Sequence, residues 1–405
     1  MISVGDELVS GATADTNAPW LAERLVSFGI APVSHHTVAD DEQAVASAIL
    51  SVCERADVVV VTGGLGPTAD DLTRQGLARA MGAELVLDDE CLARIREFFR
   101  RRGRTMAPAN RIQAMIPAGA QALPNRLGTA AGVAAAVADA RVFLMPGVPH
   151  EMREMFNSEV ASRLPKSDAV IVRRLIHTYG MGESDIARKL GDLLRQREGD
   201  VVVGTTVAAG VVSLRIVARG RDGSSAKRQA DHVEAQVRER LGALVVGTDS
   251  DTMASVVGRL LRERGQTLAT AESCTGGLVG QMITAVSGAS SYYLGGVVSY
   301  ADQAKRELLG VPRELLDEHG AVSERVAAAM ADGCRSRFAA DWAVGITGIA
   351  GPTGATDEKP VGLVWIALSG PAGTQTHRHV LPGTRGHIRR RAAMAALNHV
   401  RLALM

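Results

Sequence analysis

The feature that most constrains the fold is the five-residue run Val58–Thr62, four valines and a threonine, which Gly63 and Gly64 follow directly. A continuous β-branched run of this length is typical of a strand buried on both faces of a sheet. Ile2–Val4 and Val33–Val38 also predict strands, and apolar residues at helical spacing separate the three runs. Alternating strands and helices, with glycines at strand ends, predict a parallel α/β sheet.

The 405 residues are enough for two or three domains, and the pattern changes twice along the chain. The α/β alternation runs to about residue 164, and Pro165–Asp168 has the composition of a boundary. The next segment predicts a strand (169–177), a helix (184–197), a hairpin-like pair of strands (201–207 and 211–218) and a second helix (227–241). Gly247–Asp251 predicts a second linker. We therefore expect an α/β domain over 1–165, a small α+β connector over 166–248, and an α/β domain over 249–405.

The charge and cysteine content of the chain argue against several classes of function. A net charge of +1 argues against a dedicated nucleic-acid or membrane-surface protein, whose binding face is strongly basic. Asp6 and Glu7 interrupt any apolar N-terminal stretch, so no secretory signal is expected. The cysteines are scattered and form no C-x-x-C pair: Cys53, Cys91, Cys274 and Cys334. This usage is typical of a reducing compartment and predicts a cytoplasmic protein without a thiol-rich zinc site.

The segment from Ser273 to Ala301 carries no charged residue. Its six glycines and five serines argue against a membrane span, which would be mostly Leu, Ile, Val and Phe over about 20 residues. We expect a buried loop, helix and strand around a site instead.

A glycine-bearing turn, Ser273–Gly277, lies between a predicted strand (268–272) and a predicted helix (278–286). This arrangement exposes a side chain and points free backbone N–H groups toward the atom it attacks. A helix N-terminus favours negative charge and suits an oxyanion. Ser273 is therefore a candidate nucleophile, and Cys274 is a rival because thiolates are stronger nucleophiles. The alternative is that Ser273 or Thr275 only caps the helix.

Lys305 is the candidate base, because it follows a predicted strand (295–300) beside the uncharged segment. A desolvated lysine has a lowered pKa and can accept a proton from a serine, whereas a solvated lysine would have no such role. Val344–Pro352 predicts another strand ending in a glycine turn. Arg385 and the three arginines Arg389–Arg391 suit a phosphate or form a solvated helix face.

The N-terminal half contains three turn-rich stretches, at 62–68, 125–132 and 145–151. The first follows the valine run, where α/β sheets bind ligands. Asp70 and Asp71 follow it and predict either a hard divalent cation near a phosphate or a helix cap. The basic run Arg100–Arg104 predicts a solvated helix end, a phosphate contact or, least expected, a nucleic-acid contact.

Four stretches of the C-terminal part, AESCTGG, GGVVSYADQAK, HGAVSE and GITGIAGPTG with EKPVG, are very similar to the C-terminal domain of the CinA family. The resemblance covers about residues 253–403 and implies an α/β/α domain that deamidates nicotinamide mononucleotide through a Ser–Lys dyad, without a cofactor. It implies Ser273 as nucleophile and Lys305 as base. Implied substrate contacts are Thr275, Gly276, Gly277, Tyr300, Thr347, Gly348 and Arg385. Thr353 stands where the family often has Asp.

The stretches SVGDEL, TGGLGPTADD, NRLGTAAG and MPGVPHE resemble the N-terminal domain of the same family, which is similar to molybdopterin-binding proteins of the MoaB/MogA kind. The resemblance implies a three-layer α/β/α domain associated with metal-dependent hydrolysis of ADP-ribose, with Mg²⁺, Mn²⁺ or Co²⁺. Implied nucleotide contacts are Gly63, Gly64, Gly66, Thr68, Asn17 and Glu151, and implied metal ligands are Asp70, Asp71 and Glu7.

Two departures bear on this N-terminal prediction. Asp6 replaces a usual Thr, which adds either a metal ligand or a charge that repels a pyrophosphate, and the chain begins later than most relatives, so a shortened first strand is expected. Family resemblance also favours a homodimer. The opposing prediction for the whole chain is a non-enzymatic competence-related or molybdopterin- or nucleotide-binding protein.

Overall fold

The computed structural model describes residues 1–165, 170–195, 200–208 and 210–405. The chain divides into two compact units, the first formed by Met1–Ile171 with Gly220–Gly223 and the second by Val172–Arg219 with Ser224–Met405. Part of the predicted boundary, residues 166–168, and the first residue of the strand predicted at 169 lie outside the described residues.

The first unit is built on a six-stranded sheet of order β2-β1-β3-β8-β7-β6. Its strands are β1 (Ile2–Val4), β2 (His36–Val38), β3 (Val58–Thr62), β6 (Gln121–Leu123), β7 (Gly132–Val137) and β8 (Ala140–Met145). The valine run is β3, and its inner residues are fully buried, each contributing about 1.5–3 kcal/mol through burial. The prediction of a parallel sheet is wrong for β7, which runs antiparallel to both of its neighbours, β8 and β6, because a two-residue turn at Ala138 and Asp139 joins it to β8.

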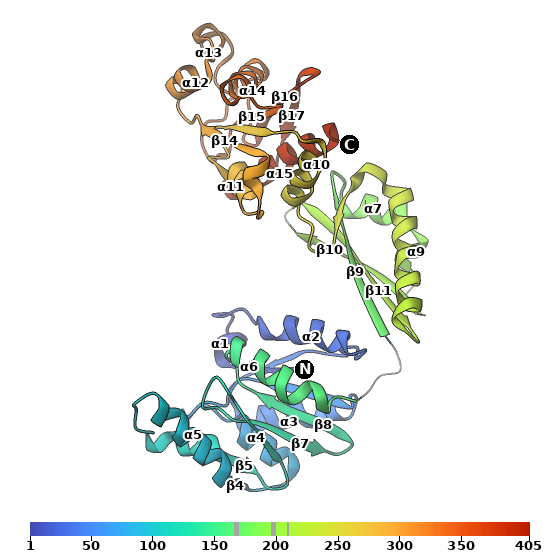
Figure 1. Ribbon diagram of the computed structural model, residues 1–405, viewed down its shortest axis with the longest axis vertical. Coiled ribbons are helices and arrows are strands. Elements are labelled where there is room, and N and C mark those ends of the chain that lie inside the picture. Colours follow the sequence, from blue (N-terminus) through green and yellow to red (C-terminus); the bar gives the residue numbers. More distant parts are fainter. Residues whose placement is uncertain (166–169, 196–199, 209) are drawn as a thin grey trace. The chain divides into compact units, whose positions relative to one another are not determined.

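Helices cover both faces of this sheet, so the unit has three layers (Figure 1). One core joins the sheet to α3 and α4 and contains Val45, Ile49 and Leu77. The other joins it to α2 and α6 and contains Leu21 and Met152. The remaining elements include a small lobe of α5, η1, β4 and β5. The bounds are α1 (Asp6–Val9), α2 (Asn17–Ser27), α3 (Glu42–Cys53), α4 (Thr73–Met81), β4 (Leu85–Leu87), α5 (Asp89–Arg101), η1 (Pro108–Ala114), β5 (Met115–Pro117), α6 (Pro149–Met155), η2 (Phe156–Val160) and η3 (Ala161–Arg163).

The second unit begins with a four-stranded sheet of order β10-β11-β9-β12, on which α9 packs. The predicted hairpin is confirmed, since β10 and β11 pair antiparallel. The helix predicted over 184–197 ends early, because Gly191 (φ 35°) separates two shorter helices; residues 196 and 197 lie outside the described residues. The elements are β9 (Val170–Tyr179), α7 (Glu183–Leu190), α8 (Asp192–Arg195), β10 (Val201–Ala208), β11 (Val211–Gly220), α9 (Gly223–Leu241), η4 (Gly242–Leu244) and β12 (Val245–Thr248).

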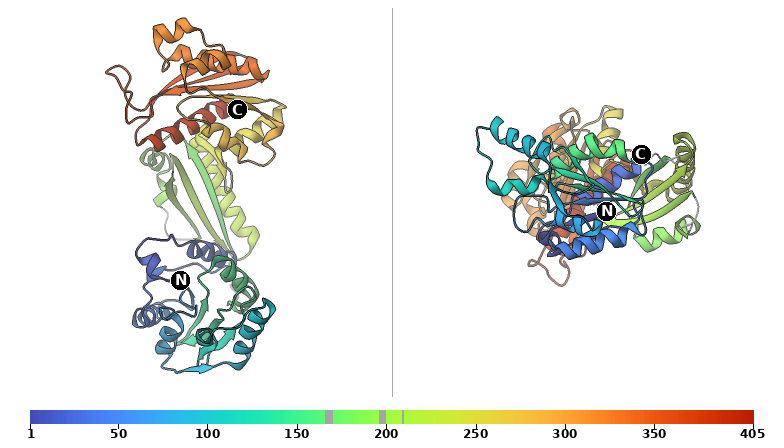
Figure 2. Two further views of the ribbon diagram at one scale, coloured as in Figure 1. Left: turned by 90° about the vertical axis from the view of Figure 1, so that its left-hand side faces the viewer. Right: turned by 90° about the horizontal axis from the view of Figure 1, so that it is seen from below.

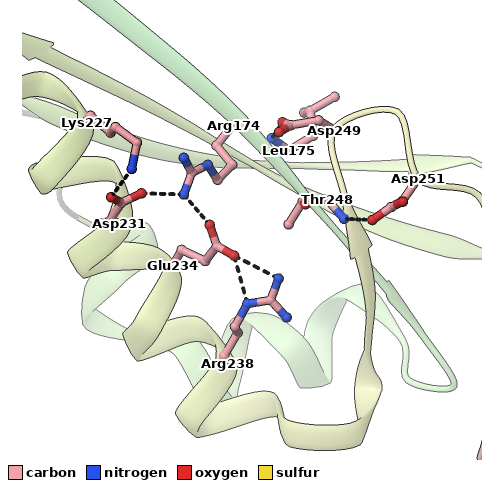
Figure 3. A network of polar contacts seen from close by, with 9 residues as sticks. All are labelled: Arg174, Leu175, Lys227, Asp231, Glu234, Arg238, Thr248, Asp249 and Asp251. Atoms are coloured by element: carbon pink, nitrogen blue, oxygen red, sulfur yellow. Dashed lines mark hydrogen bonds and ion pairs between the residues drawn. The ribbon is translucent and has the colours of Figure 1, made fainter. Parts of the chain in front are cut away.

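An ion-pair network ties β9 to α9 (Figure 3). Arg174 on the strand bonds Asp231 at 2.6 Å and also contacts Glu234 on the helix. Lys227 and Arg238 bond the same two carboxylates from one helical turn on either side. Each charge therefore has at least one opposite neighbour, which aligns the helix along the strand.

The C-terminal sheet has the order β14-β13-β15-β16-β17, in which β14, β13 and β15 are parallel and β16 runs antiparallel to both of its neighbours, β15 and β17. One core joins it to α10, α11 and α15, and another to α12–α14. In the left-hand view of Figure 2, α15 (red) lies on one face and the orange helices on the other. The elements are α10 (Met253–Arg264), β13 (Leu268–Glu272), α11 (Leu278–Thr284), η5 (Ala289–Ser291), β14 (Tyr293–Val298), α12 (Asp302–Leu309), α13 (Arg313–His319), α14 (Glu324–Phe338), β15 (Trp342–Gly348), β16 (Leu363–Gly370), β17 (Gly373–Val380) and α15 (Arg385–Ala403).

The charge-free segment 273–301 forms a turn, helix α11 and strand β14, which confirms the predicted elements. The segment is buried only in part, however: the start of the turn is buried as expected, whereas β14 is an edge strand with alternate residues exposed. Across the described ranges, no helix combines the length and apolar character that crossing a bilayer requires.

Candidate functional site

The carboxyl ends of three parallel strands meet at one edge of the C-terminal sheet. Glu272, the last residue of β13, is in register with Val298 on β14 and Ile346 on β15. The backbone N–H of Ser273 donates to the Ile346 carbonyl at 2.9 Å, and that of Ser299 donates to the Glu272 carbonyl at 2.8 Å. These bonds hold Ser273 between the ends of β14 and β15.

The turn after β13 requires its two glycines. Gly276 and Gly277 have φ values of 59° and 89°, a region that favours glycine. The helix that follows, α11, has Gly277 at its N-cap position. Glycine has no side chain, so the N-cap residue itself supplies no capping hydrogen bond. Instead the buried carboxylate of Glu272 accepts from the N–H groups of Val279 (3.0 Å) and Gly280 (2.9 Å). The alternative that Ser273 or Thr275 caps the helix is therefore wrong, and Glu272 is a residue that the sequence analysis missed.

Ser273 is 8% exposed, and two other hydroxyls beside it are buried without a hydrogen-bond partner in the part of the chain that the structure describes, Thr275 Oγ1 and Ser299 Oγ. Buried hydroxyls normally have partners, and unpaired ones mark strain, function or an unoccupied ligand position. The strand end thus carries hydroxyl groups that its own backbone does not use.

Cys274, the rival nucleophile, belongs to the hydrophobic core. Burial raises the pKa of its thiol to about 12, so the thiol stays protonated at neutral pH. Because the thiolate is the reactive form, this environment favours Ser273 over Cys274 as a nucleophile.

Lys305 lies on the first turn of α12 and is 1% exposed, so the solvated alternative is wrong. Its Nζ donates to the Tyr300 carbonyl at 3.1 Å and to Asp302 Oδ1 at 3.3 Å. Within the described ranges no hydrogen bond joins Lys305 to Ser273. The dyad itself stays a prediction, although both residues follow neighbouring strands at the same sheet edge.

Tyr300 and Arg385 come together at this edge, where Arg385 Nη2 donates to the Tyr300 hydroxyl at 3.0 Å. Arg385 also donates to the Gly351 carbonyl at 2.9 Å, which ties α15 to the glycine turn after β15. The hydroxyl of Thr347 donates to the Ala321 carbonyl, so its side chain is already bonded. Among the three arginines Arg389–Arg391, Arg389 donates to the Thr275 carbonyl at 2.7 Å and thereby stabilises the turn that follows Ser273.

A cavity of about 550 Å³ opens at the carboxyl end of β3 in the first unit. Most of the residues implied for the N-terminal site line it: Glu7, Asn17, Gly63, Gly64, Gly66, Asp70, Asp71 and Glu151. Thr68 does not; its hydroxyl contacts the Asp71 carboxylate instead. Asp15 and Asp40 also line the cavity, although neither is among the contacts or metal ligands that the resemblance implies.

Hydrogen bonds join the three turn-rich stretches around this cavity, and the Gly63 N–H of the first donates to the Met145 carbonyl of the third at 3.1 Å. Asn17 Nδ2 donates to the Gly147 carbonyl at 2.7 Å, and Asn125 Nδ2 donates to Glu151 at 2.7 Å. Gly63 has a φ of 100°, and a Cβ there would lie 2.1 Å from the Val4 carbonyl oxygen, so only glycine fits. Buried Arg74, which sequence reasoning also missed, donates to two carbonyls of the same loop, at Leu65 and Gly66, both at 2.9 Å.

The predicted metal ligands are not gathered in one group. Asp71 accepts from the Gly66 and Thr68 N–H groups at 2.6 and 2.9 Å, so it stabilises the loop. No set of three or more His, Cys, Asp or Glu side chains suited to a metal occurs among the residues that the structure describes. Burial, and then the neighbouring charges of Asp6, Glu7 and Asp70, raise the pKa of Asp40. The divalent metal therefore stays a prediction, in a cavity of crowded carboxylates.

Three protein-family models match the chain. They are described as "CinA C-terminal domain" (residues 250–404), "Probable molybdopterin binding domain" (1–166) and "Damage-inducible protein CinA KH domain" (173–247). The predicted fold class, with a MoaB/MogA-like N-terminal domain, is confirmed.

Similar proteins match over the full length. A "CinA-like protein" of Geobacter sulfurreducens is 43% identical over 407 residues, covering 100% of this chain and 98% of that one. A "CinA-like protein" of Frankia casuarinae is 44% identical over 414 residues, covering 100% and 95%. Among solved structures, the competence/damage inducible protein CihA of Agrobacterium tumefaciens is 40% identical over 38% of this chain and 93% of that chain, with a TM-score of 0.37.

Proposed function

Because the chain belongs to the CinA family, we propose that its C-terminal site hydrolyses the carboxamide of nicotinamide mononucleotide, releasing ammonia and nicotinate mononucleotide. The observation that most supports this proposal is the grouping of candidate residues at the sheet edge where β13 and β14 end. Ser273 and the buried Lys305 follow these adjacent strands, and the Tyr300–Arg385 pair lies beside them.

In the proposed reaction Ser273 Oγ attacks the carboxamide carbon, while Lys305 Nζ accepts the hydroxyl proton. The C–N bond then breaks, and the leaving nitrogen takes that proton and departs as ammonia. Water hydrolyses the resulting serine ester to the carboxylate. No metal is required in this sequence of steps.

Backbone N–H groups of the Thr275–Gly277 turn would stabilise the tetrahedral oxyanion, worth about 3 kcal/mol per donor in other acyl-transfer sites. Glu272 would hold this turn by capping α11, and Arg389 would brace it through the Thr275 carbonyl. Arg385 would face the substrate phosphate, because a guanidinium matches phosphate geometry.

The experiment is ammonia release from nicotinamide mononucleotide by the full chain and by Ser273→Ala, Cys274→Ala and the control Ser287→Ala. Ser287 is an exposed serine in the same charge-free segment. We expect activity to be lost only in Ser273→Ala. Full activity in that variant would remove the serine mechanism, and no ammonia from the unaltered chain would favour a non-enzymatic binding protein.

A second proposed activity, hydrolysis of ADP-ribose at its pyrophosphate, rests on the 550 Å³ cavity and the three loops bonded around it. The volume of this cavity lies in the usual range for small-molecule sites. The test is AMP formation from ADP-ribose with Mg²⁺, Mn²⁺ or Co²⁺ and with a chelator. AMP in none of these conditions would leave only a binding role for this cavity.

A further inference from the structure

A second cavity, of about 520 Å³, lies in the first unit between α5 and the segment from Ala122 to Ala131. It is distinct from the β3 cavity, with which it shares only the lining residue Thr129. Neither the proposed deamidation nor the proposed ADP-ribose hydrolysis uses it. Arg101 and Arg102, from the basic run at the end of α5, line it; Figure 1 shows where α5 lies in this unit.

The cavity is strongly basic. Four arginines line it, Arg94, Arg101, Arg102 and Arg126, against a single carboxylate, Glu97. A helix C-terminus carries a partial charge of roughly −0.5, which a single arginine more than offsets, so the end of α5 does not account for the other guanidinium groups. Hydrogen bonds from Arg100 and Arg101 lower the pKa of Glu97 to about 2, so this carboxylate stays ionised.

The arginines are available to an anion. Arg94 and Arg101 pair with Glu90 and Glu97, but these pairs are largely exposed, and exposed pairs contribute little. The ion pairs of Arg126 with Glu154 and Glu159 are long, at 3.7 Å. Arg102 has no carboxylate partner among the described residues. Its guanidinium lies 3.6 Å from the centroid of the Phe98 ring.

The floor of the cavity is apolar. Cys91, Ile95, Leu123 and Ala131 line it and are buried, and the partly buried ring of Phe98 adjoins them. The site therefore combines an apolar floor with a rim of guanidinium groups. That combination matches a ligand with one flat apolar end and one phosphate end, since guanidinium groups bind phosphate and pair with ring faces.

We propose that this second cavity is a binding site for a nucleoside monophosphate, with the phosphate held by Arg102 and Arg126 and the base packed against Phe98 and the apolar floor. Its concave shape and volume suit a small molecule better than a nucleic-acid backbone, which tracks extended basic surfaces. Because Thr129 lines both cavities, a ligand bound here would contact the loop that also borders the β3 cavity.

The test is equilibrium binding of AMP to the full chain and to the double variant Arg102→Ala/Arg126→Ala. The matched control is Arg96→Ala, an exposed arginine on the same helix that does not line the cavity. Leu8→Trp, which places a large ring in the β3 cavity, separates the two sites. We expect affinity to fall at least tenfold in the double variant, to stay unchanged in Arg96→Ala, and to persist in Leu8→Trp.

Adenosine and a short single-stranded oligonucleotide complete the design. Weaker binding of adenosine than of AMP supports recognition of the phosphate, and equal binding overturns it. Oligonucleotide binding that exceeds AMP binding and depends on the same arginines would assign the surface to nucleic acid and overturn the proposal. Unchanged AMP affinity in the double variant would also overturn the proposal. Both substituted arginines are exposed, so the variant should fold, and a thermal melt checks this.

Discussion

Two glycine turns, one in each unit, occupy the same place in their sheets but have different surroundings. Gly63 and Gly64 follow β3 and open onto a cavity of about 550 Å³ with several carboxylates on its walls. The turn at 273–277 follows β13 and is closely packed: Ser273 is 8% exposed, and Lys305 is 1% exposed. The turn at the carboxyl end of a strand therefore borders an open cavity with acidic walls in one unit and a closely packed edge in the other.

The two turns also differ in whether their polar side chains have hydrogen-bond partners. In the first unit, the Asp71 carboxylate and buried Arg74 are bonded to the loop, so they fix its shape. In the second, Thr275 Oγ1 and Ser299 Oγ are buried without partners in the described part of the chain. Under the proposed functions, the first turn would surround a ligand and the second would present Ser273 to one.

The largest expected effect is on the rate of the C-terminal site alone, and it follows from removing the amine of Lys305. Lys305→Met should lower ammonia release from nicotinamide mononucleotide by at least 10²-fold, since general-base catalysis contributes about 10²–10⁴-fold. Lys189→Met, at an exposed lysine, is the control. Ligand binding in the β3 cavity should not change in either variant. Ammonia release by Lys305→Met at the rate of the control would show that Lys305 is structural.

The next effect concerns the first turn alone. Gly63→Ala should lower the free energy of unfolding by more than about 2 kcal/mol, because its Cβ would lie 2.1 Å from the Val4 carbonyl oxygen. Gly11→Ala is the matched control: Gly11 also has a positive φ, 74°, but its Cβ would meet nothing within 4 Å. It should cost about 1 kcal/mol. Urea unfolding measures both, and equal losses would refute the steric argument.

A smaller effect tests the cap of α11. Glu272→Ala removes the acceptor for the Val279 and Gly280 N–H groups and should destabilise the C-terminal sheet by about 1–2 kcal/mol. Ammonia release should also fall, since the turn that carries Ser273 loses its anchor. A variant with unaltered stability and rate would mean that the turn holds its shape without this carboxylate.

The last effect is a pH dependence. Burial, with the neighbouring His377 and His379, lowers the pKa of His399 to about 3. Because the folded pKa is depressed, the unfolded chain binds the proton first. Stability should therefore decline as pH falls below about 6.5 and level off near pH 3. Unfolding free energies at several pH values should give a shallower slope for His399→Gln, and an identical slope would contradict this origin.

The sequence predicted those features that depend on neighbouring residues. The run Val58–Thr62 is β3 with the predicted bounds, and Leu268–Glu272 is β13. In each case a β-branched or apolar run ends at a glycine turn, so local propensity and burial agree. The antiparallel β7 was not predicted, because its direction depends on a two-residue turn at Ala138 and Asp139 that lacks the usual glycine.

The candidate site was predicted in part for the same reason. Motif residues such as Gly63 and Asp70 line one cavity. Glu272 and Asp40 were missed, since their roles depend on partners that only the folded backbone supplies: helix N–H groups for Glu272, and carboxylates from two other segments for Asp40. A sequence pattern also could not show that Lys305 is buried and bonded to Tyr300 and Asp302.

The most direct test of the central claim is to locate the covalent intermediate. The full chain is mixed with nicotinamide mononucleotide, quenched in acid within one turnover, digested and analysed by fragmentation mass spectrometry. We expect a nicotinate mononucleotide ester on the hydroxyl of Ser273 and none on Cys274. An adduct on Cys274 or any other residue, or undiminished ammonia release by Ser273→Ala, would contradict it.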